Sequence, residues 1–530
     1  MAQRPDLVVV APPPTPNGDL HVGHLSGPYL GADVFTRFER LRGRAVVSAI
    51  SADDNQSYVV TTAERLGRCP RELARESHAD IRHTLEQAGI AFDIVGRPDA
   101  AYDSFVRGYL DRLVDAGAFV ERSSDALIDA RTGRQLIESY VGGRCPVCFV
   151  ATCGNICESC GHPNDPSRLI RPMALGAEGG ITAEKVKAMV LPLERYRSRL
   201  ENHYRRQRMR PELTRLLEAL LERPLGDFPI TYRSDWGLPV QRAGWESAVY
   251  NVWAEMYPGH LYWTQQAGAA AWERDEGVRY VQFIGFDNSF FYAVAHVAIS
   301  LAADDAGLPV APLPEIVTNQ FYMLENSKFS TSQGHVIWGK ELLAEWSADP
   351  FRLYLCLSNP ETQESNFAVA DMAQVLEERL VRPFERLRRS WNRMVRSGRV
   401  EATPDGEWAS WQREFRRRFE LSYAPETFSL RRAATTLTAY LDFFSSELEV
   451  ADRDGLTCSA APMAQLAVYA TPLMPGFAET LAECAGIVTT LSWTSPPVQS
   501  TDELREIPCN LLELRHGQVA SPERGILHVH

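Results

Sequence analysis

A short apolar run that leads through a turn into a helix constrains this chain more than any other feature. Leu7 to Val10 read as a strand, the segment APPPTPNGDL supplies the turn, and an amphipathic helical pattern begins near His24. The start of such a helix offers free N–H groups and the positive end of its dipole, which favour a phosphate ligand. Gly23 leaves room for a nucleotide against the backbone. His21 and His24 are then placed to donate hydrogen bonds to an α-phosphate as negative charge builds on it.

A second strand follows in the same pattern. The apolar run from Ala45 to Ile50 ends in SADDNQS, and a helical stretch comes next. Strand, helix and strand in succession predict a parallel sheet, and parallel sheets place ligands at the carboxyl ends of their strands. The HVGH segment and the acids Asp53 and Asp54 both lie just beyond such ends, so we expect them to share one pocket.

Composition excludes several classes of protein. At 530 residues the chain is too long for one core, so about three domains are expected. No apolar run is long enough to span a bilayer and the N-terminus lacks a signal-peptide pattern, so we expect a cytoplasmic protein without a membrane partner. A net charge of −13 argues against a globally basic nucleic-acid binder but leaves room for a local basic face.

The cysteines cluster in a way that predicts a metal site. Five of the ten cysteines fall within residues 145–160, and four of them form two Cys-x2-Cys pairs: Cys145, Cys148, Cys157 and Cys160. Paired thiolates at this spacing are typical of a tetrahedral structural zinc knuckle, with no open position for catalysis. Cys153 is interpreted as a bystander. A reduced thiol cluster without metal is the alternative.

A lysine-bearing loop supplies a second candidate for phosphate chemistry. The segment KFSTS, Lys328 to Ser332, follows a predicted strand. A lysine on a loop that closes over a triphosphate would neutralise the β- and γ-phosphates as pyrophosphate leaves. An ordinary surface loop is the alternative for this segment taken by itself.

HVGH followed far downstream by KFSTS resembles the class I aminoacyl-tRNA synthetases, and within that class the methionyl-tRNA synthetases. The similarity runs over residues 6–360 and then fades. It rests on the following pieces: PNGDLHVGH, ADVFTRFERLRG, SADDN, the four-cysteine knuckle, ITYRSDWGLPV, VYNVW, FIGFD, SKFSTSQG and SADPFRLYL.

The resemblance implies an α/β fold. A Rossmann-type parallel sheet is split by a connective peptide that carries the zinc knuckle, and an α-helical bundle of the anticodon-binding type follows. The expected division is a first catalytic half over 1–115, the connective peptide over 116–229 with the knuckle at about 143–163, a second catalytic half over 230–345, the helical domain over 346–510 and a tail over 511–530.

The resemblance also implies the chemistry and the residues that perform it. An amino acid and ATP would give an aminoacyl-adenylate and pyrophosphate, and the aminoacyl group would then pass to an acceptor hydroxyl. His21, His24 and Lys328 would be catalytic. ATP would be bound by Pro14, Asn17, Gly18, His21, Gly23, His24, Gly285, Asp287, Lys328 and Ser330. The amino acid would contact Pro13, Thr15, Asp54, Trp253, Tyr257, Asn288 and Tyr292, with Asp54 on its α-ammonium group and Trp253 as one wall. For Trp253 a place in the core is the alternative.

The chain departs from the family pattern at several of these positions. Thr331 stands where the family's loop has a second lysine, and Phe286 stands where a lysine follows the FIG glycine. The family's DEHG-like motif reads DDNQS, with Gln56 and Ser57. We expect the change at Thr331 to weaken amino-acid activation rather than abolish it.

The amino-acid pocket departs further. Pro13 and Thr15 replace a leucine and a tyrosine, and Met256, Tyr257 and His260 replace an alanine, a proline and a tyrosine. Asn288 and Tyr292 replace an apolar residue and a histidine. Polar groups raise the cost of burying a thioether, and a site that hydrogen-bonds its substrate discriminates strongly. We therefore predict that the activated amino acid is not methionine, or not only methionine.

The C-terminal part lacks the family's anticodon-reading pattern. The corresponding helix reads RLRRS, Arg386 to Ser390, and the later segment SSELEV offers no tryptophan. Its arginines supply charge for a phosphate backbone, which positions RNA without reading its sequence. The alternative, which the neighbouring glutamates favour, is that they only form ion pairs along the helix face.

Three functions fit these residues. The chain is a methionyl-type synthetase that charges a tRNA, a paralogue that passes a different amino acid to another acceptor in a specialised pathway, or a non-catalytic relative that binds RNA or protein. The presence of both histidines, both site aspartates and Lys328 favours an enzyme. Mg²⁺ is expected with ATP, held mainly by the substrate phosphates.

Overall fold

The chain folds into two compact units. The computed structural model describes residues 4–176, 180–269, 272, 277–325, 327–328, 336–401, 406–487, 490–493 and 503–512. The first unit, called the sheet unit, comprises Met1–Asp19, Val47–Arg82 and Phe92–Asn319, and the second, called the helical unit, comprises Leu20–Val46, His83–Ala91 and Gln320–His530. Among the described residues, no helix is both long and apolar enough to cross a bilayer.

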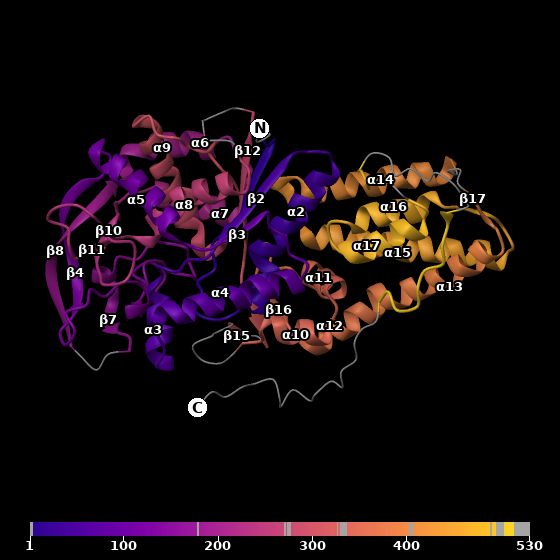
Figure 1. Ribbon diagram of the computed structural model, residues 1–530, viewed down its shortest axis with the longest axis horizontal. Coiled ribbons are helices and arrows are strands. Elements are labelled where there is room, and N and C mark those ends of the chain that lie inside the picture. Colours follow the sequence, from indigo (N-terminus) through magenta and orange to yellow (C-terminus); the bar gives the residue numbers. More distant parts are fainter. Residues whose placement is uncertain are drawn as a thin grey trace. The chain divides into compact units, whose positions relative to one another are not determined.

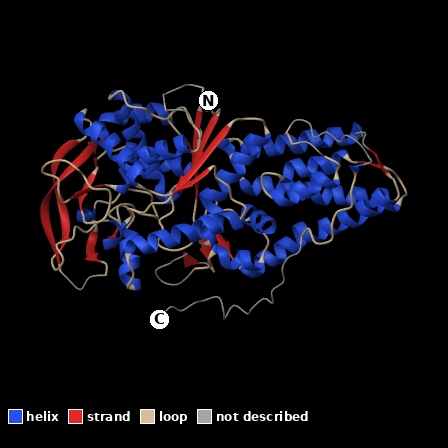
Figure 2. Cartoon of the chain, in the orientation of Figure 1, coloured by secondary structure: helices blue, strands red, loops and turns tan. Residues whose placement is uncertain are grey.

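A five-stranded sheet organises the sheet unit (Figures 1 and 2). Its order is β13-β12-β1-β2-β3, formed by Glu315–Asn319, Arg279–Gly285, Leu7–Val10, Val46–Ser51 and Ile94–Gly96. The pairs β1–β12, β12–β13 and β2–β3 are parallel, with Leu7 opposite Arg279. The chain order reverses between β1 and β12, and in doubly wound folds ligands bind at this switch point, beyond the carboxyl ends of the strands. The predicted parallel α/β sheet is therefore confirmed.

Apolar side chains on both faces of the sheet explain its strands. All four residues of β1 are buried, as expected for a parallel strand that helices cover on both sides. Phe291 and Tyr292 belong to the same core cluster as Val8 and Val10. The helices of this unit are α3 (Ser57–Leu66), α4 (Pro70–Gln87, which continues into the helical unit), α5 (Ala100–Asp115), α6 (Arg197–Tyr204), α7 (Pro211–Leu221), α8 (Val252–Gln266) and α9 (Val297–Asp305), with the π-helix η6 (Phe291–His296).

Between α5 and α8 the chain forms antiparallel strands instead. One sheet has the order β4-β8-β9, formed by Val120–Asp129, Ile181–Pro192 and Asp227–Pro229, and a second has the order β6-β5-β7, formed by Ala151–Cys153, Val141–Arg144 and Ile170–Ala174. A hairpin pairs β10 (Thr231–Arg233) with β11 (Ala248–Tyr250). Short 3-10 turns lie at η2 (Glu138–Tyr140), η3 (Pro166–Arg168), η4 (Leu193–Tyr196) and η5 (Phe286–Asn288).

The helical unit begins with a helix that is interrupted once. The segment α1 (Val22–His24), the π-helix η1 (Leu25–Tyr29) and α2 (Leu30–Leu41) follow one another, with non-helical angles at Gly27 just before Pro28. The later helices are α10 (Gly339–Glu345), α11 (Ala348–Leu357), α12 (Val369–Leu376), α13 (Arg382–Arg396), α14 (Gly406–Tyr423), α15 (Leu430–Arg453), α16 (Ala461–Ala470) and α17 (Pro475–Cys484), with η8 (Glu377–Val381) and η9 (Pro425–Thr427). Short strands lie at β14 (Tyr322–Leu324), β15 (Ser327–Lys328), β16 (Ser365–Phe367), β17 (Val400–Glu401) and β18 (Cys458–Ser459).

A buried ion pair joins distant parts of the helical unit. Arg352 on α11 lies 2.6 Å from Asp33 on α2, and both side chains are 1% exposed. The same guanidinium donates to the carbonyls of Gly89, Pro472 and Leu473. A buried charge is tolerated only when it is paired and hydrogen-bonded, and this one is.

The helices α10 to α17 confirm the predicted helical C-terminal region.

Candidate active site

The carboxyl edge of the parallel sheet gathers most of the predicted substrate residues. Pro13 and Thr15 follow β1, Asp54 follows β2, and Asp287 and Asn288 follow β12. The backbone N–H of Asp53 donates to the carbonyl of Pro14 at 3.1 Å, so the first two segments are in contact. The three segments leave the strands that flank the switch point, where a doubly wound sheet binds its ligand.

Local geometry fixes the segment after β12. Asp287 lies in the turn η5, and Asn288 Nδ2 donates to Asp287 Oδ1 at 3.2 Å. A Cβ at position 285 would lie less than 3.0 Å from that same carboxylate oxygen, so a larger residue there would displace the Asp287 side chain. Phe286, which stands where the resemblance places a lysine, is 8% exposed and belongs to the core cluster.

Asp54 keeps one carboxylate oxygen available. Arg97 donates to Asp54 Oδ2 from both Nε and Nη2 at 2.8 Å. Oδ1 is buried and has no hydrogen-bond partner among the described residues. Burial raises the pKa of Asp54, and the Arg97 charge opposes that rise. A buried acceptor without a donor is costly, and a substrate ammonium group is a donor that would satisfy it.

Three more carboxyl groups are buried in the same unit, and the sequence reasoning did not select two of them. Asp53, Glu138 and Glu255 are 5%, 4% and 2% exposed. Burial is the main cause that raises the pKa of each, and the pKa of Glu255 reaches about 7. None of the three forms an ion pair with a described residue. The available signal was an acid inside an apolar run, as in VWAEMY around Glu255.

Neutral donors hold these carboxyl groups. Asn55 Nδ2 lies 2.9 Å from both oxygens of Glu255. Ser57 Oγ donates to Glu138 at 3.0 Å, and Trp253 Nε1 donates to its other oxygen at 2.8 Å. Asn55 and Ser57 belong to the DDNQS segment, so this departure from the family pattern supplies partners for the buried acids.

Trp253 is held on three sides. Besides its bond to Glu138, its ring stacks on Phe291 with 3.8 Å between ring centres and 9° between planes. Its carbonyl oxygen lies 2.7 Å from Nε2 of His296. The ring is partly exposed, so Trp253 is not a fully enclosed core residue, and its position is fixed by hydrogen bonding and stacking.

Two predicted pocket residues lie deeper. Tyr257 is buried and donates to Ser300 Oγ at 2.9 Å. Tyr292 is fully buried, and its hydroxyl lies 3.1 Å from His260 Nε2. The resemblance places a tyrosine at 260 and a histidine at 292, so the two residue types have changed places. In this chain the two side chains form an imidazole–phenol hydrogen bond.

The phosphate-binding candidates of the helical unit form a stacked pair. The His21 and His24 rings lie 3.6 Å apart, and each Nδ1 accepts the backbone N–H of the other residue, at 3.3 and 3.4 Å. A neutral imidazole that accepts at Nδ1 carries its proton at Nε2, which is the nitrogen that would donate to a phosphate. The backbone of Lys328 lies in β15, whereas its side chain and residues Ser330 and Thr331 lie outside the described part of the chain.

The four predicted metal ligands come together. The Sγ atoms of Cys145, Cys148, Cys157 and Cys160 all lie within 4.8 Å of one another. Cys145 and Cys160 are 3.8 Å apart, and Cys148 and Cys157 are 3.5 Å apart. Zinc–sulfur bonds of about 2.3 Å in a tetrahedron place sulfurs about 3.8 Å apart, so the cluster fits a structural zinc ion. Cys153 lies outside it, 3.5 Å from the Tyr58 hydroxyl.

Five of the six arginines of α13 are paired with acids of the helical unit, and the sixth, Arg389, donates to the backbone carbonyl of Glu385 at 3.1 Å. The pairs are Arg382–Glu377, Arg386–Asp442, Arg388–Glu385, Arg393–Asp452 and Arg396–Glu506, at 2.5 to 3.1 Å. The pairs with Glu377 and Glu385 are the ion pairs along the helix face that the neighbouring glutamates favoured, whereas the other three reach Asp442 and Asp452 of α15 and the distant Glu506.

Comparison with known proteins identifies relatives across most of the chain. The family model of class I tRNA synthetases (M) matches residues 7–389. A methionine–tRNA ligase of Roseiflexus sp. is 31% identical over 401 residues, which cover 71% of this chain and 67% of the relative. The ligase of Rubrobacter xylanophilus is 30% identical over 389 residues, with 69% and 67% covered. The solved structure of Mycobacterium tuberculosis methionyl-tRNA synthetase with methionyl-adenylate has a TM-score of 0.67 at 19% identity and covers 91% of this chain and 94% of that one, which supports the fold.

Proposed function

Because the chain belongs to the family of class I tRNA synthetases (M), we propose that it activates an amino acid with ATP and transfers the aminoacyl group to the 3′ end of a tRNA. The observation that carries this proposal is the carboxyl edge of the parallel sheet. There Asp54 presents a buried oxygen without a donor, and Asp287 follows the strand on the other side of the switch point.

The proposed first step is adenylate formation. A carboxylate oxygen of the amino acid attacks the α-phosphorus of ATP, the bond to the bridging oxygen breaks, and pyrophosphate leaves with its electron pair. The Nε2–H groups of His21 and His24 donate to the α-phosphate, and Lys328 offsets the charge on the leaving phosphates. Asp54 Oδ1 accepts from the α-ammonium group and Asp287 lies by the ribose.

The proposed second step is acyl transfer. A hydroxyl of the acceptor attacks the carbonyl carbon of the adenylate, the carbon–oxygen bond to AMP breaks, and AMP leaves with the electron pair while its phosphate takes up the hydroxyl proton. Mg²⁺ bound with the triphosphate would offset part of its negative charge. The four knuckle thiolates would hold Zn²⁺ in a closed shell, so that ion would order β5 to β7 and take no part in the reaction.

We infer a polar amino-acid substrate. Thr15 and Asn288 bring polar groups where the family has apolar or aromatic ones, and buried acids line the region around Trp253. Since unpaired buried polar groups disfavour an apolar ligand, methionine is expected to be a poor substrate.

Pyrophosphate exchange into ATP tests the activation step. The purified protein is assayed with each proteinogenic amino acid and with polar analogues, and Lys328→Ala is compared with Lys185→Ala, whose lysine lies on β8 in an exposed ion pair with Asp125. We expect exchange with a polar amino acid and a loss of about 10²-fold or more in Lys328→Ala only. Absence of exchange with every amino acid, or an equal loss in both variants, would contradict the proposal.

A second acceptor class is favoured by one observation. Five of the six α13 arginines already have acidic partners within the helical unit, so apart from Arg389 this helix presents little unpaired charge to a phosphate backbone. The alternative function transfers the aminoacyl group to a small molecule or carrier. Mass spectrometry of tRNA incubated with ATP and the activated amino acid distinguishes the two, because a labelled tRNA 3′ end supports the first function and unlabelled tRNA with continued exchange supports the second.

A further inference from the structure

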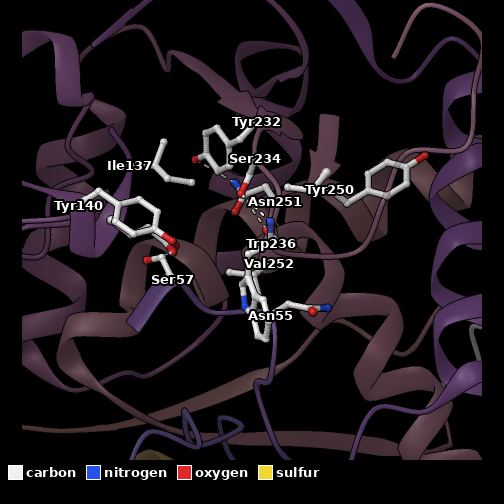
Figure 3. A pocket seen from close by; sticks show the side chains of 12 residues that line it. Asn55, Ser57, Ile137, Tyr140, Tyr232, Ser234, Trp236, Tyr250, Asn251 and Val252 are labelled. Atoms are coloured by element: carbon white, nitrogen blue, oxygen red, sulfur yellow. Dashed lines mark hydrogen bonds between the residues drawn. The ribbon is translucent and has the colours of Figure 1, made fainter. Parts of the chain in front are cut away.

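A cavity beside Trp253 has not been assigned a role. It is small, with about 20 Å³ of space for the centre of a water-sized probe, and lies wholly within the sheet unit, where segments before and after the cysteine knuckle meet the start of α3 (Figure 3). Its walls include Asn55, Ser57, Glu138, Tyr140, Tyr232 and Trp236. Figure 3 shows Tyr140 with its hydroxyl near Ser57, whereas the ring of Tyr250 points away from the cavity.

Glu138 is the one acidic side chain of the cavity wall. It is 4% exposed, and neither of its carboxylate oxygens meets a cation of the described chain. Its donors are all neutral: the hydroxyl and the backbone N–H of Ser57 and Nε1 of Trp253, whereas a carboxylate has about four acceptor sites. The Glu138 carboxylate can therefore accept a further hydrogen bond from a ligand.

The backbone at Glu138 supports a functional role. Its φ angle is +43°, a left-handed conformation that non-glycine residues seldom adopt and that costs about 1–3 kcal/mol. Strain of this kind persists only where the surroundings impose it. Here Asn155 accepts the Glu138 N–H, and Ser57 bonds to both Glu138 and Ser139, so the carboxylate is held at the cavity wall against local preference.

Aromatic rings complete the wall. Tyr140, Tyr232 and Trp236 border the cavity, and aromatic faces attract cations. Two of these rings already accept guanidinium groups: Arg134 lies 4.6 Å from the Tyr140 ring centre and Arg71 lies 5.6 Å from the Trp236 ring centre. A buried carboxylate with aromatic neighbours is a chemical match for an alkylammonium group.

The cavity adjoins the predicted amino-acid pocket. Asn55 of its wall directly follows Asp54, and Trp236 Nε1 donates to the Asp54 carbonyl at 3.2 Å. Trp253, predicted as a wall of the amino-acid pocket, bonds to Glu138. A ligand whose α-ammonium group meets Asp54 Oδ1 thus lies beside the residues that border the cavity.

We propose that this cavity binds the side-chain ammonium group of the activated amino acid, with Glu138 as its counter-ion, so that the substrate is a diamino acid. This inference rests on the proposed activation of an amino acid at the carboxyl edge of the sheet. A neutral isostere leaves Glu138 without its partner, and sites built for a polar group reject analogues that lack it. Diamino acids are therefore expected to bind at least about 100-fold more tightly than neutral amino acids of the same length.

Calorimetric binding with defined probes tests the inference without requiring turnover. The intact protein is titrated with 2,4-diaminobutyrate, ornithine and lysine, and with norvaline, norleucine and methionine as neutral counterparts. Glu138→Gln keeps the size of the side chain and removes its charge. Tyr250→Phe is the matched control, because it alters a cavity residue whose hydroxyl bonds instead to Asp111 at 2.6 Å.

The expected result is tight binding of one diamino acid, a loss of at least about 30-fold in Glu138→Gln, and no change in Tyr250→Phe. Equal binding of charged and neutral amino acids, no binding of any diamino acid, or retention of the preference in Glu138→Gln would overturn the inference. Thermal unfolding and the zinc content of Glu138→Gln confirm that it is folded, and if it is not, Ser57→Ala, which removes one donor to Glu138, serves in its place and is expected to weaken diamino-acid binding more than norleucine binding.

Pyrophosphate exchange separates this inference from the proposed function. Exchange with methionine or another neutral amino acid, with no preference for diamino acids, leaves amino-acid activation standing and overturns the substrate class. Tight, Glu138-dependent binding of a diamino acid without exchange leaves the cavity's ligand standing and contradicts the activation chemistry.

Discussion

The carboxyl edge of the parallel sheet and helix α13 hold their charges in opposite ways. Around β2 and α8, Asp53, Glu138 and Glu255 are buried with neutral donors only, and Asp54 has one oxygen without any donor. On α13, Arg386, Arg388 and Arg396 each have an acidic side chain of the same unit within 3.1 Å. The first region contains unbalanced buried charge, and the second contains balanced surface charge.

This difference indicates what each region is for. Leaving a carboxylate buried without a cation costs stability, and chains retain such groups where a ligand supplies the missing charge. Surface ion pairs contribute little to stability, and their charge is already offset, so they attract a phosphate backbone weakly. This contrast supports the proposal that the sheet edge receives the substrate, whereas most α13 arginines are paired with acids of their own unit.

The largest effect is expected where a buried charge does have its partner. Asp33→Ala removes the carboxylate that Arg352 meets at 2.6 Å, with both side chains 1% exposed. Breaking a buried pair from one side costs about 3–5 kcal/mol, measured as the free energy of unfolding in urea. The control Asp442→Ala removes the partner of Arg386, an exposed pair, and should cost less than about 1 kcal/mol. If Asp33→Ala and Asp442→Ala lower the free energy of unfolding equally, the buried pair is no more important to stability than the surface pair.

The pH dependence of stability measures the unbalanced charge at the sheet edge. The pKa of Glu255 is raised from 4.5 to about 7, chiefly by burial, with Asp54 and Asp103 adding to the rise and Asn55 and Tyr102 opposing it. Between these values the folded protein holds a proton that the unfolded chain has released, so stability falls as pH rises through that window. The shift corresponds to about 3 kcal/mol.

Urea unfolding at pH 5 and pH 8 checks this prediction. The wild type should be the less stable at pH 8, and Glu255→Gln should lose most of the difference between the two pH values. Asp53 and Glu138, whose pKa values burial also raises, contribute in the same direction. A wild type that gains stability from pH 5 to pH 8 would show that these carboxyl groups are balanced by cations after all.

Asp54→Asn tests the available oxygen directly. The substitution keeps the size of the side chain but removes the charge that would meet the α-ammonium group. Losing one partner of such a hydrogen-bonded charge pair costs about 2–5 kcal/mol, so kcat/KM for pyrophosphate exchange should fall by about 10²-fold while the melting temperature changes little. Arg97→Met is the companion variant, because it removes the donor to the other oxygen. If Asp54→Asn exchanges pyrophosphate at the wild-type rate, Asp54 does not bind the α-ammonium group of the substrate.

Sequence patterns predicted the features that rest on local periodicity and spacing. The apolar run of β1, the turn before α1 and the two Cys-x2-Cys pairs each follow from residues close together in the chain, and the sheet and the four-thiolate cluster are as predicted. The ion pairs of α13 were one of two alternatives, because the pattern of alternating charges shows that pairs are feasible without showing that they form.

The contacts between distant segments could not be predicted in the same way. Glu138 reaches Ser57 and Trp253 across 81 and 115 residues of sequence, and its left-handed backbone has no sequence signal in a glutamate. The exchange of histidine and tyrosine at 260 and 292 was visible only as two separate departures from the family pattern. In the folded chain the two side chains form one hydrogen bond.

The smallest effect is expected on α13, and it bears on the acceptor. Arg386→Ala removes one side of an exposed pair with Asp442, and Arg393→Ala removes an exposed arginine whose partner Asp452, 6% exposed, keeps its second partner Arg399 at 2.6 Å. Each should change the free energy of unfolding by less than about 1 kcal/mol and leave pyrophosphate exchange unchanged, since the proposed activation site uses no residue of this helix. If a tRNA acceptor rests on this helix, the same variants weaken aminoacyl transfer to tRNA and lower the salt dependence of tRNA binding, because each phosphate contact adds about one unit to that slope. If both variants transfer the aminoacyl group to tRNA at the wild-type rate and bind tRNA with the wild-type salt dependence, the acceptor does not contact α13. The arginines of this helix then serve only its own ion pairs, unlike the carboxyl groups at the sheet edge.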